Sequence, residues 1–189
     1  MNAADFLQKY KFEICIFVLA LTVRLLFLGL SYSAHDGNLI TTINAGDSYY
    51  DISQNIIVGN GYSAALEPPY TPTSYRTPGM PYFIAWVYFL FGSYFAVIFV
   101  QIVIGSIIPL LGMRIARYIT EVRGISIAVG VFLALEPTGV LLSILLLSEI
   151  LFTLLFSLSL LCLFRYWKEK TLAPLLLSAF LLGVSTLVR

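Results

Sequence analysis

The chain has 189 residues, of which 59% are apolar and 11% are charged, and its formal net charge is +1. Soluble domains carry about 25% charged residues, so the composition excludes an ordinary soluble domain, and the near-neutral charge gives no sign of a nucleic-acid partner. Cys15 and Cys162 lie inside apolar runs, and His35 is the one histidine. We therefore expect neither a disulfide framework nor a metal cage built from histidines.

Four apolar stretches are candidates for membrane-spanning helices, since one span needs about 20 apolar residues. They are Phe12–Leu30, Ser93–Met113, Gly124–Tyr166 and Ala173–Val188. The third is long enough for two crossings, because Glu136-Pro137 predicts the end of one span and Ser148-Glu149 predicts the start of the next. The predicted fold class is an all-α polytopic membrane protein of about five transmembrane helices, forming a single domain over residues 1–189.

The positions of the basic residues predict the orientation of these spans. Eight of the eleven basic residues gather at three sites, namely Lys9, Lys11, Arg114, Arg117, Arg123, Arg165, Lys168 and Lys170. Five crossings place all three sites on one side of the membrane. Lysine and arginine are enriched on the cytoplasmic side, so we assign this side as cytoplasmic. The N-terminus is then cytoplasmic and the polar loop over residues 32–92 lies outside. A cleaved signal peptide is the alternative for the N-terminus, but the apolar pattern resumes after Arg24 and continues to Leu30.

Two short helices are expected inside this outer loop. Met80–Phe91 is apolar but only 12 residues long, about 18 Å as a helix, and Gly92 offers a break before the next span. A separate crossing here would place the arginines after Ser93–Met113 outside, so we predict a helix at the outer membrane interface. Ser48–Val58 can form a second, amphipathic helix.

Two aspartates in this loop are candidates for acid–base chemistry. Asp47 follows a glycine and precedes the Ser48–Val58 helix, so its simplest role is to cap that helix. Asp51 lies four positions further on, which would put both carboxylates on one helix face. Two like charges so placed raise one pKa or call for a cation, and a general base needs a carboxylate that can be tuned in this way.

Three further charged residues are candidates for binding. The planar guanidinium of Arg76 suits phosphate, although attraction to lipid headgroups explains it equally well. Arg24, in the outer part of the first span, either snorkels outward or reaches a lipid phosphate. Glu149 is a carboxylate near the outer boundary of the membrane, and therefore a functional candidate, but a helix N-terminus capped by Ser148 is the structural alternative.

The order of motifs in the loop resembles the first outer loop of GT-C glycosyltransferases, in particular the group of protein O-mannosyltransferases and lipid A aminoarabinose transferases. The similar segments are Gly46-Asp47 with Tyr50, Gly59-Asn60-Gly61-Tyr62, Arg76-Thr77-Pro78-Gly79-Met80-Pro81-Tyr82, Leu90-Phe91-Gly92, Leu147-Ser148-Glu149-Ile150-Leu151-Phe152 and Leu182-Gly183 running to Arg189. The resemblance covers about residues 10–189. Each motif is loose, whereas their order and spacing together are fairly specific.

The resemblance implies an enzyme that takes a sugar from a polyprenyl-phosphate carrier at the outer membrane face and passes it to a protein, lipid or glycan acceptor. It implies Asp47 as the catalytic base and Glu149 as a second acidic position. The family often has an acidic pair where this chain has Ser48 after Asp47, so Asp51 is our substitute for the second acid. No cofactor is implied with certainty, and a divalent metal is left open because some relatives use one and others do not.

The predicted mechanism is a single displacement, in which Asp47 accepts the acceptor's proton while Arg76, with Arg24, stabilises the leaving phosphate. Relatives have about twice as many spans, so the chain is expected to be the N-terminal part of a larger GT-C fold. Its expected location is a bacterial or archaeal plasma membrane. Two alternatives remain: a transporter fragment, which would need polar groups at mid-membrane, and a non-catalytic scaffold or truncated remnant.

Overall fold

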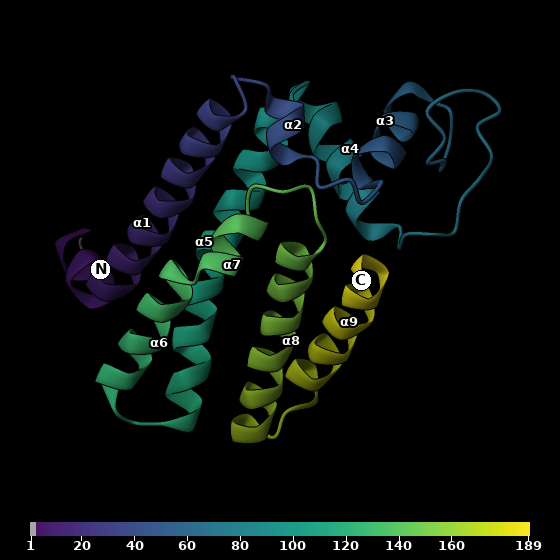
Figure 1. The fold of residues 1–189 in the computed structure, drawn as a ribbon. Coiled ribbons are helices and arrows are strands. Elements are labelled where there is room, and N and C mark those ends of the chain that lie inside the picture. The colour runs from purple at the N-terminus through teal and green to yellow at the C-terminus, as the bar shows by residue number, and fades with distance from the viewer. Residues whose placement is uncertain (1–2) are drawn as a thin grey trace.

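The computed structural model describes residues 3–189 as a set of helices with no strand in that range (Figure 1). The helices are α1 (Ala3–Ala34), α2 (Leu39–Ile43), α3 (Tyr49–Val58), α4 (Gly79–Phe91), α5 (Tyr94–Ile119), α6 (Arg123–Leu135), α7 (Pro137–Leu142), α8 (Glu149–Glu169) and α9 (Leu172–Val188). The predicted fold class, an all-α polytopic membrane protein, is confirmed.

Three of the helices are long and apolar enough to cross a membrane. They are α1 from Gln8 onward, α5 and α8. The two other predicted spans are shorter, because α6 has 13 residues and α9 has 17, which correspond to about 20 and 26 Å of helix. The prediction of five crossings therefore stays a prediction.

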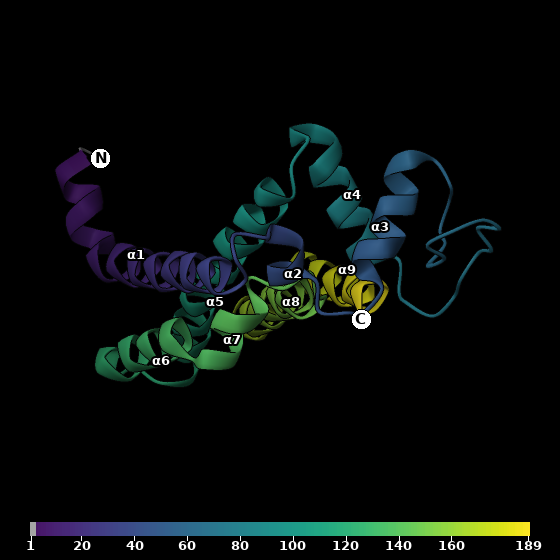
Figure 2. The same ribbon diagram turned by 45° about the horizontal axis from the view of Figure 1, so that its top comes forward.

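Helix α5 is central to the packing of the long helices. It contacts α1, α6 and α8, and α8 in turn pairs with α9. Helices α2, α3 and α4 lie together at one end of this bundle, and the α5–α6 and α8–α9 turns lie at the other (Figures 1 and 2). The start of α1 reaches that second end, where Glu13 pairs with Arg117 at 2.7 Å. The three basic sites of the sequence thus lie opposite the polar loop.

The loop helices end where local sequence predicts. Gly59 and Gly92 follow α3 and α4 with φ of 86° and 66°, a left-handed conformation that glycine adopts without steric cost. Ser93 caps α5 by accepting a hydrogen bond from the backbone N–H of Phe95 at 3.2 Å. The two predicted short helices are confirmed. Each ends at the predicted residue and begins within one residue of the predicted start.

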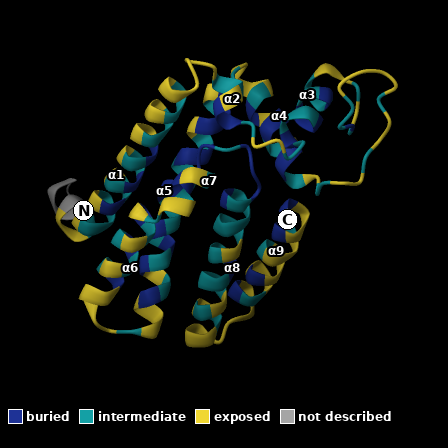
Figure 3. Cartoon of the chain, viewed as in Figure 1, coloured by how far each residue is buried: buried dark blue, intermediate teal, exposed yellow. Residues whose placement is uncertain are grey.

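The main apolar core lies beneath the loop helices and not in the middle of the long ones (Figure 3). It joins α2, α4, α5 and the segment before α8, and its fully buried members include Ile43, Met80, Ile84, Ile98, Ile102 and Ile144. The far ends of α8 and α9 are largely exposed in Figure 3. The loop helices therefore form a packed platform, made of α2, α3 and α4 with the apolar core beneath them. The exposed apolar faces of the long helices are available for contact with lipid.

The connection from α6 to α8 runs through this platform. Between the predicted end of one span at Glu136-Pro137 and the predicted start of the next at Ser148-Glu149, the chain forms α7 and then a bent segment that crosses to α8. The Gln101 side-chain amide donates to Leu142 O at 3.0 Å and to Leu145 O at 2.5 Å. Leu146 N donates to Ile43 O at 2.9 Å. These bonds bring the start of α8 beside the first polar loop.

Candidate active site

Asp47 lies in a tight turn before α3. Gly46 and Ser48 on either side of it both have positive φ, 73° and 64°, and the Asn44 side chain accepts from Gly46 N at 3.0 Å. Ser48 precedes the first residue of α3, and that helix has no side-chain cap. Asp47 is therefore not the helix cap that its position suggested, and its carboxylate is turned to another partner.

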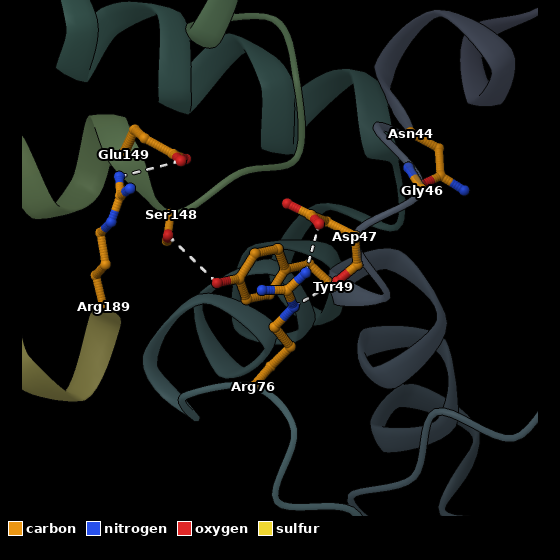
Figure 4. Close-up of polar contacts among 8 residues, drawn as sticks. All are labelled: Asn44, Gly46, Asp47, Tyr49, Arg76, Ser148, Glu149 and Arg189. Carbon is orange, nitrogen blue, oxygen red and sulfur yellow. Dashed lines mark hydrogen bonds and ion pairs between the residues drawn. The ribbon is translucent and has the colours of Figure 1, made fainter.

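That partner is Arg76, 29 positions along the chain. The Arg76 guanidinium forms an ion pair with the Asp47 carboxylate, and its Nε donates to Asp47 O at 2.9 Å (Figure 4). The guanidinium also lies over the rings of Tyr49 and Tyr75, 5.2 and 4.6 Å from their centroids. The ion pair is partly exposed, with 43% of the Asp47 side chain and 25% of the Arg76 side chain accessible. It is thus held in place but open to a ligand.

Tyr49 connects this pair to the start of α8. Its ring is buried beneath Arg76, and its hydroxyl donates to Ser148 Oγ at 3.3 Å (Figure 4). The Ser148 side chain makes no helix-capping bond, so the capping role that we considered for it is wrong. The first polar loop and the start of α8 therefore meet at Tyr49.

Glu149 pairs with a residue that the sequence did not single out. Its Oε1 lies 3.1 Å from Arg189 Nη1 (Figure 4), and its Oε2 is buried without a hydrogen-bond partner among the described residues. The end of α9 reaches this position because Thr77 Oγ1 donates to Val188 O at 2.8 Å. Arg189 stood at the end of a similar motif, but no role could be read from that motif alone.

Asp51 stands apart from the ion pair of Asp47 with Arg76. Because Asp47 precedes the helix and Ser48 is left-handed, the two aspartates do not share a helix face, and the spacing argument for them is wrong. Burial raises the pKa of the Asp51 carboxyl above its usual value of 3.8. Its part in the chemistry remains a prediction.

Arg24 does not snorkel outward, which was one of the two alternatives for it. The residue is 2% exposed, and its donors are taken up by Ser143 Oγ at 3.0 Å, Ala20 O at 3.1 Å and Ala134 O at 3.2 Å. Glu136, close to this cluster in sequence, caps α7 by accepting from Thr138 N and Gly139 N at 2.9 and 2.5 Å. These partners tie α1 to the α6–α7 corner. Phosphate binding by Arg24 stays a prediction.

An open groove of about 520 Å³ adjoins Arg76. Its lining includes Tyr62, Tyr75 and Tyr82, and the Tyr62 hydroxyl donates to the carbonyls of Arg76 and Thr77 at 2.9 and 3.1 Å. The tyrosine rings and the guanidinium together offer a surface for a polar ligand with flat or hydroxylated faces.

The carboxylates of the site do not assemble a metal centre. Within the described part of the chain, no three histidine, cysteine or acidic side chains gather closely enough to hold an ion. Asp47 and Glu149 are each paired with an arginine. Among the described residues, the donor set at this site therefore does not fit a metal ion.

Comparison with known protein families matches residues 75–189, more than half of the chain, to the dolichyl-phosphate-mannose-protein mannosyltransferase family. The matched region includes Arg76, Glu149 and Arg189, whereas Asp47 lies before it. No curated protein and no solved structure matches the chain.

Proposed function

The chain belongs to the dolichyl-phosphate-mannose-protein mannosyltransferase family, a GT-C type of membrane glycosyltransferase, and on that premise we propose that it transfers a sugar from a polyprenyl-phosphate carrier to a hydroxylated acceptor. The acceptor is a protein, a lipid or a glycan. The observation that carries the proposal is the meeting of Asp47 and Arg76 beside the start of α8. A base and a cation for phosphate are the two groups that such a displacement needs.

Asp47 is the proposed base. A general base must reach the proton of the attacking hydroxyl, and partial exposure of the Asp47 carboxylate leaves an oxygen accessible to an acceptor. The carboxylate is anchored by the turn around it and not consumed by helix capping. The loop is packed in place, because α3 and α4 lie on each other over the buried core. The turn and the packed helices therefore hold the carboxylate in position before substrate arrives.

Arg76 is the proposed phosphate ligand. The leaving group is a lipid phosphate that gains negative charge, and a guanidinium binds phosphate through two parallel hydrogen bonds. Tyr49 and Tyr75 lie against the guanidinium, and its edge is directed at Asp47. When donor phosphate takes this edge, the ion pair with Asp47 weakens and the carboxylate is released to act as base.

Glu149 and Arg189 supply a second, supporting pair. The unpartnered Glu149 Oε2 can accept a hydrogen bond from a substrate hydroxyl, and Arg189 is 56% exposed and can share the phosphate.

We propose that residues 1–189 act as one domain with the polar loop facing outward. The orientation rests on the basic residues at the opposite end of the bundle.

The substitution Asp47→Asn, made in the natural protein, tests the proposal. Loss of a positioned base lowers kcat by about 10²- to 10⁴-fold, measured as sugar transfer from a polyprenyl-phosphate donor. Asp36→Asn is the matched control, because Asp36 is an exposed residue of the same loop whose φ of 54° asparagine tolerates well. Transfer by Asp47→Asn at the rate of the control would overturn the assignment of the base.

A further inference from the structure

A second polar cavity lies at the opposite end of the bundle from Asp47. It has a volume of about 340 Å³ and is formed where α1 begins, α5 ends and α6 begins. Its lining residues are Lys9, Tyr10, Glu13, Arg117, Glu121, Arg123 and Ser126. None of them takes part in the proposed glycosyl transfer.

Two buried polar atoms in this cavity lack partners among the described residues. Ser126 is 0% exposed and its Oγ makes no hydrogen bond. Glu13 Oε2 is also buried and unpartnered, although Oε1 accepts from Arg117 at 2.7 Å. Leaving a buried polar atom unsatisfied is costly, and the cavity has room for much more than the single water that would satisfy such an atom. Together they offer a ligand one donor and one acceptor.

The charge around these atoms favours a phosphate, because three basic residues of the lining outnumber its two acidic residues, Glu13 and Glu121. Glu13 neutralises Arg117, whereas Lys9 and Arg123 form no ion pair within residues 8–189 and lie over aromatic rings instead. The N-terminus of α6 also faces this region without a side-chain cap, so its free N–H groups add positive potential. Ser126, Arg123 and the helix end thus point to an anionic oxygen ligand.

An apolar groove continues from the cavity. It has a volume of about 410 Å³, shares Tyr10 and Glu13 with the cavity, and is otherwise lined by Ile14, Phe17, Leu110 and Arg114. The backbone of α1 leaves helical geometry at Tyr10, close to Gln8, where its apolar span begins. A polar cavity that opens onto an apolar groove along a span has the two parts that a phospholipid needs, and a free anion needs only the first.

We propose that this cavity is a phospholipid headgroup site, in which Ser126, Arg123 and Lys9 hold the phosphate and the adjoining groove holds the upper part of an acyl chain. Glu13 Oε2 accepts a hydrogen bond from the headgroup's hydroxyl or ammonium donor. The site is independent of sugar transfer, and its failure would leave the proposed function untouched.

Native mass spectrometry of the purified full-length protein, titrated with phosphatidylglycerol, tests the site. Ser126→Ala and Arg123→Gln should each weaken lipid binding by about tenfold, the loss expected for one charge-assisted hydrogen bond. Lys11→Gln is the control, since Lys11 is an exposed basic residue of α1 at the same end of the bundle but lines neither cavity. Ser126→Ala is a sharp probe because removing an unpartnered hydroxyl should not unfold the protein.

The probes also separate the source of the phosphate. Diacylglycerol, which lacks phosphate, should bind weakly and equally to all variants. Inorganic phosphate should compete with phosphatidylglycerol only at far higher concentration, because it does not fill the groove. Equal lipid binding by Ser126→Ala, Arg123→Gln and Lys11→Gln would overturn the proposal, and so would inorganic phosphate that binds as tightly as the lipid.

Discussion

Gly79 allows the end of α9 to dock on the loop that carries Arg76. A Cβ at this position would lie 2.7 Å from Leu187 O, 2.8 Å from Val188 Cγ2 and 2.9 Å from Val188 Cα. Two of these three atoms are backbone, so a side-chain rotation cannot relieve the contact. Gly79→Ala should therefore push the end of α9 away from the loop, together with the Arg189 side chain that pairs with Glu149.

The size of the effect follows from three terms. Overpacking against fixed neighbours costs about 1–3 kcal/mol, and loss of the hydrogen bond from Thr77 Oγ1 to Val188 O costs about 0.5–1.5 kcal/mol. Alanine is better than glycine in a helix by roughly 0.5–1 kcal/mol, which offsets part of this. Gly79→Ala should lower the free energy of unfolding by about 0.5–4 kcal/mol, or the Tm by roughly 1–16 °C for a chain of this size.

Thermal unfolding in detergent, followed by intrinsic fluorescence, measures this difference. Gly183→Ala is the matched control, because Gly183 lies on α9 and a Cβ added there would meet no atom within 4 Å, so the substitution should leave the Tm unchanged or raise it. Thr77→Val should cost less in the Gly79→Ala background than in the wild type, since both changes break the same contact. A Gly79→Ala protein as stable as Gly183→Ala would refute the docking argument.

Two further substitutions test assignments made above. Arg24→Met should lower the free energy of unfolding by about 2–4 kcal/mol, because it leaves Ala134 O and the Ser143 hydroxyl without their buried partner. A stable Arg24→Met protein with weakened donor binding would instead indicate that Arg24 binds the donor phosphate. Asp51→Asn should gain Tm relative to the wild type as the pH rises in the acidic range. Burial raises the pKa of Asp51 in the folded state, so in the wild type its favourable contribution is full below pH 3.8 and is lost as the pH rises through the folded pKa. A pH profile of Asp51→Asn identical to that of the wild type would exclude this contribution.

Helix boundaries were readable from the sequence because local residues determine them. Pro137 ends α6 after Leu135, and α8 begins at Glu149, both as predicted. Glycines at positive φ likewise end α3 and α4. Steric limits on φ and ψ act within one or two residues, so a single sequence contains the information that they require.

The partners of the charged side chains were not readable in the same way. Asp47 and Arg76 are 29 positions apart, and Glu149 meets Arg189 only because α8 and α9 pack side by side and Thr77 fixes the end of α9. Arg24 looked like an outward-facing arginine in an apolar helix, yet α6 and the segment after α7 supply oxygens that bury it. Such pairings depend on packing between distant elements, which spacing along the chain does not encode.

The pairing of Asp47 with Arg76 has a consequence for the proposed order of binding. Arg76 holds the Asp47 carboxylate while no donor is bound, so an acceptor hydroxyl must compete with the guanidinium for it. A donor phosphate competes for the same guanidinium and frees the carboxylate in the step that places the anomeric carbon nearby. The proposed site would thereby couple the activation of its base to the presence of the donor. Arg76→Gln would break this coupling: it should raise the KM for the donor while leaving Asp47 available without it, whereas an unchanged KM would separate Arg76 from the phosphate.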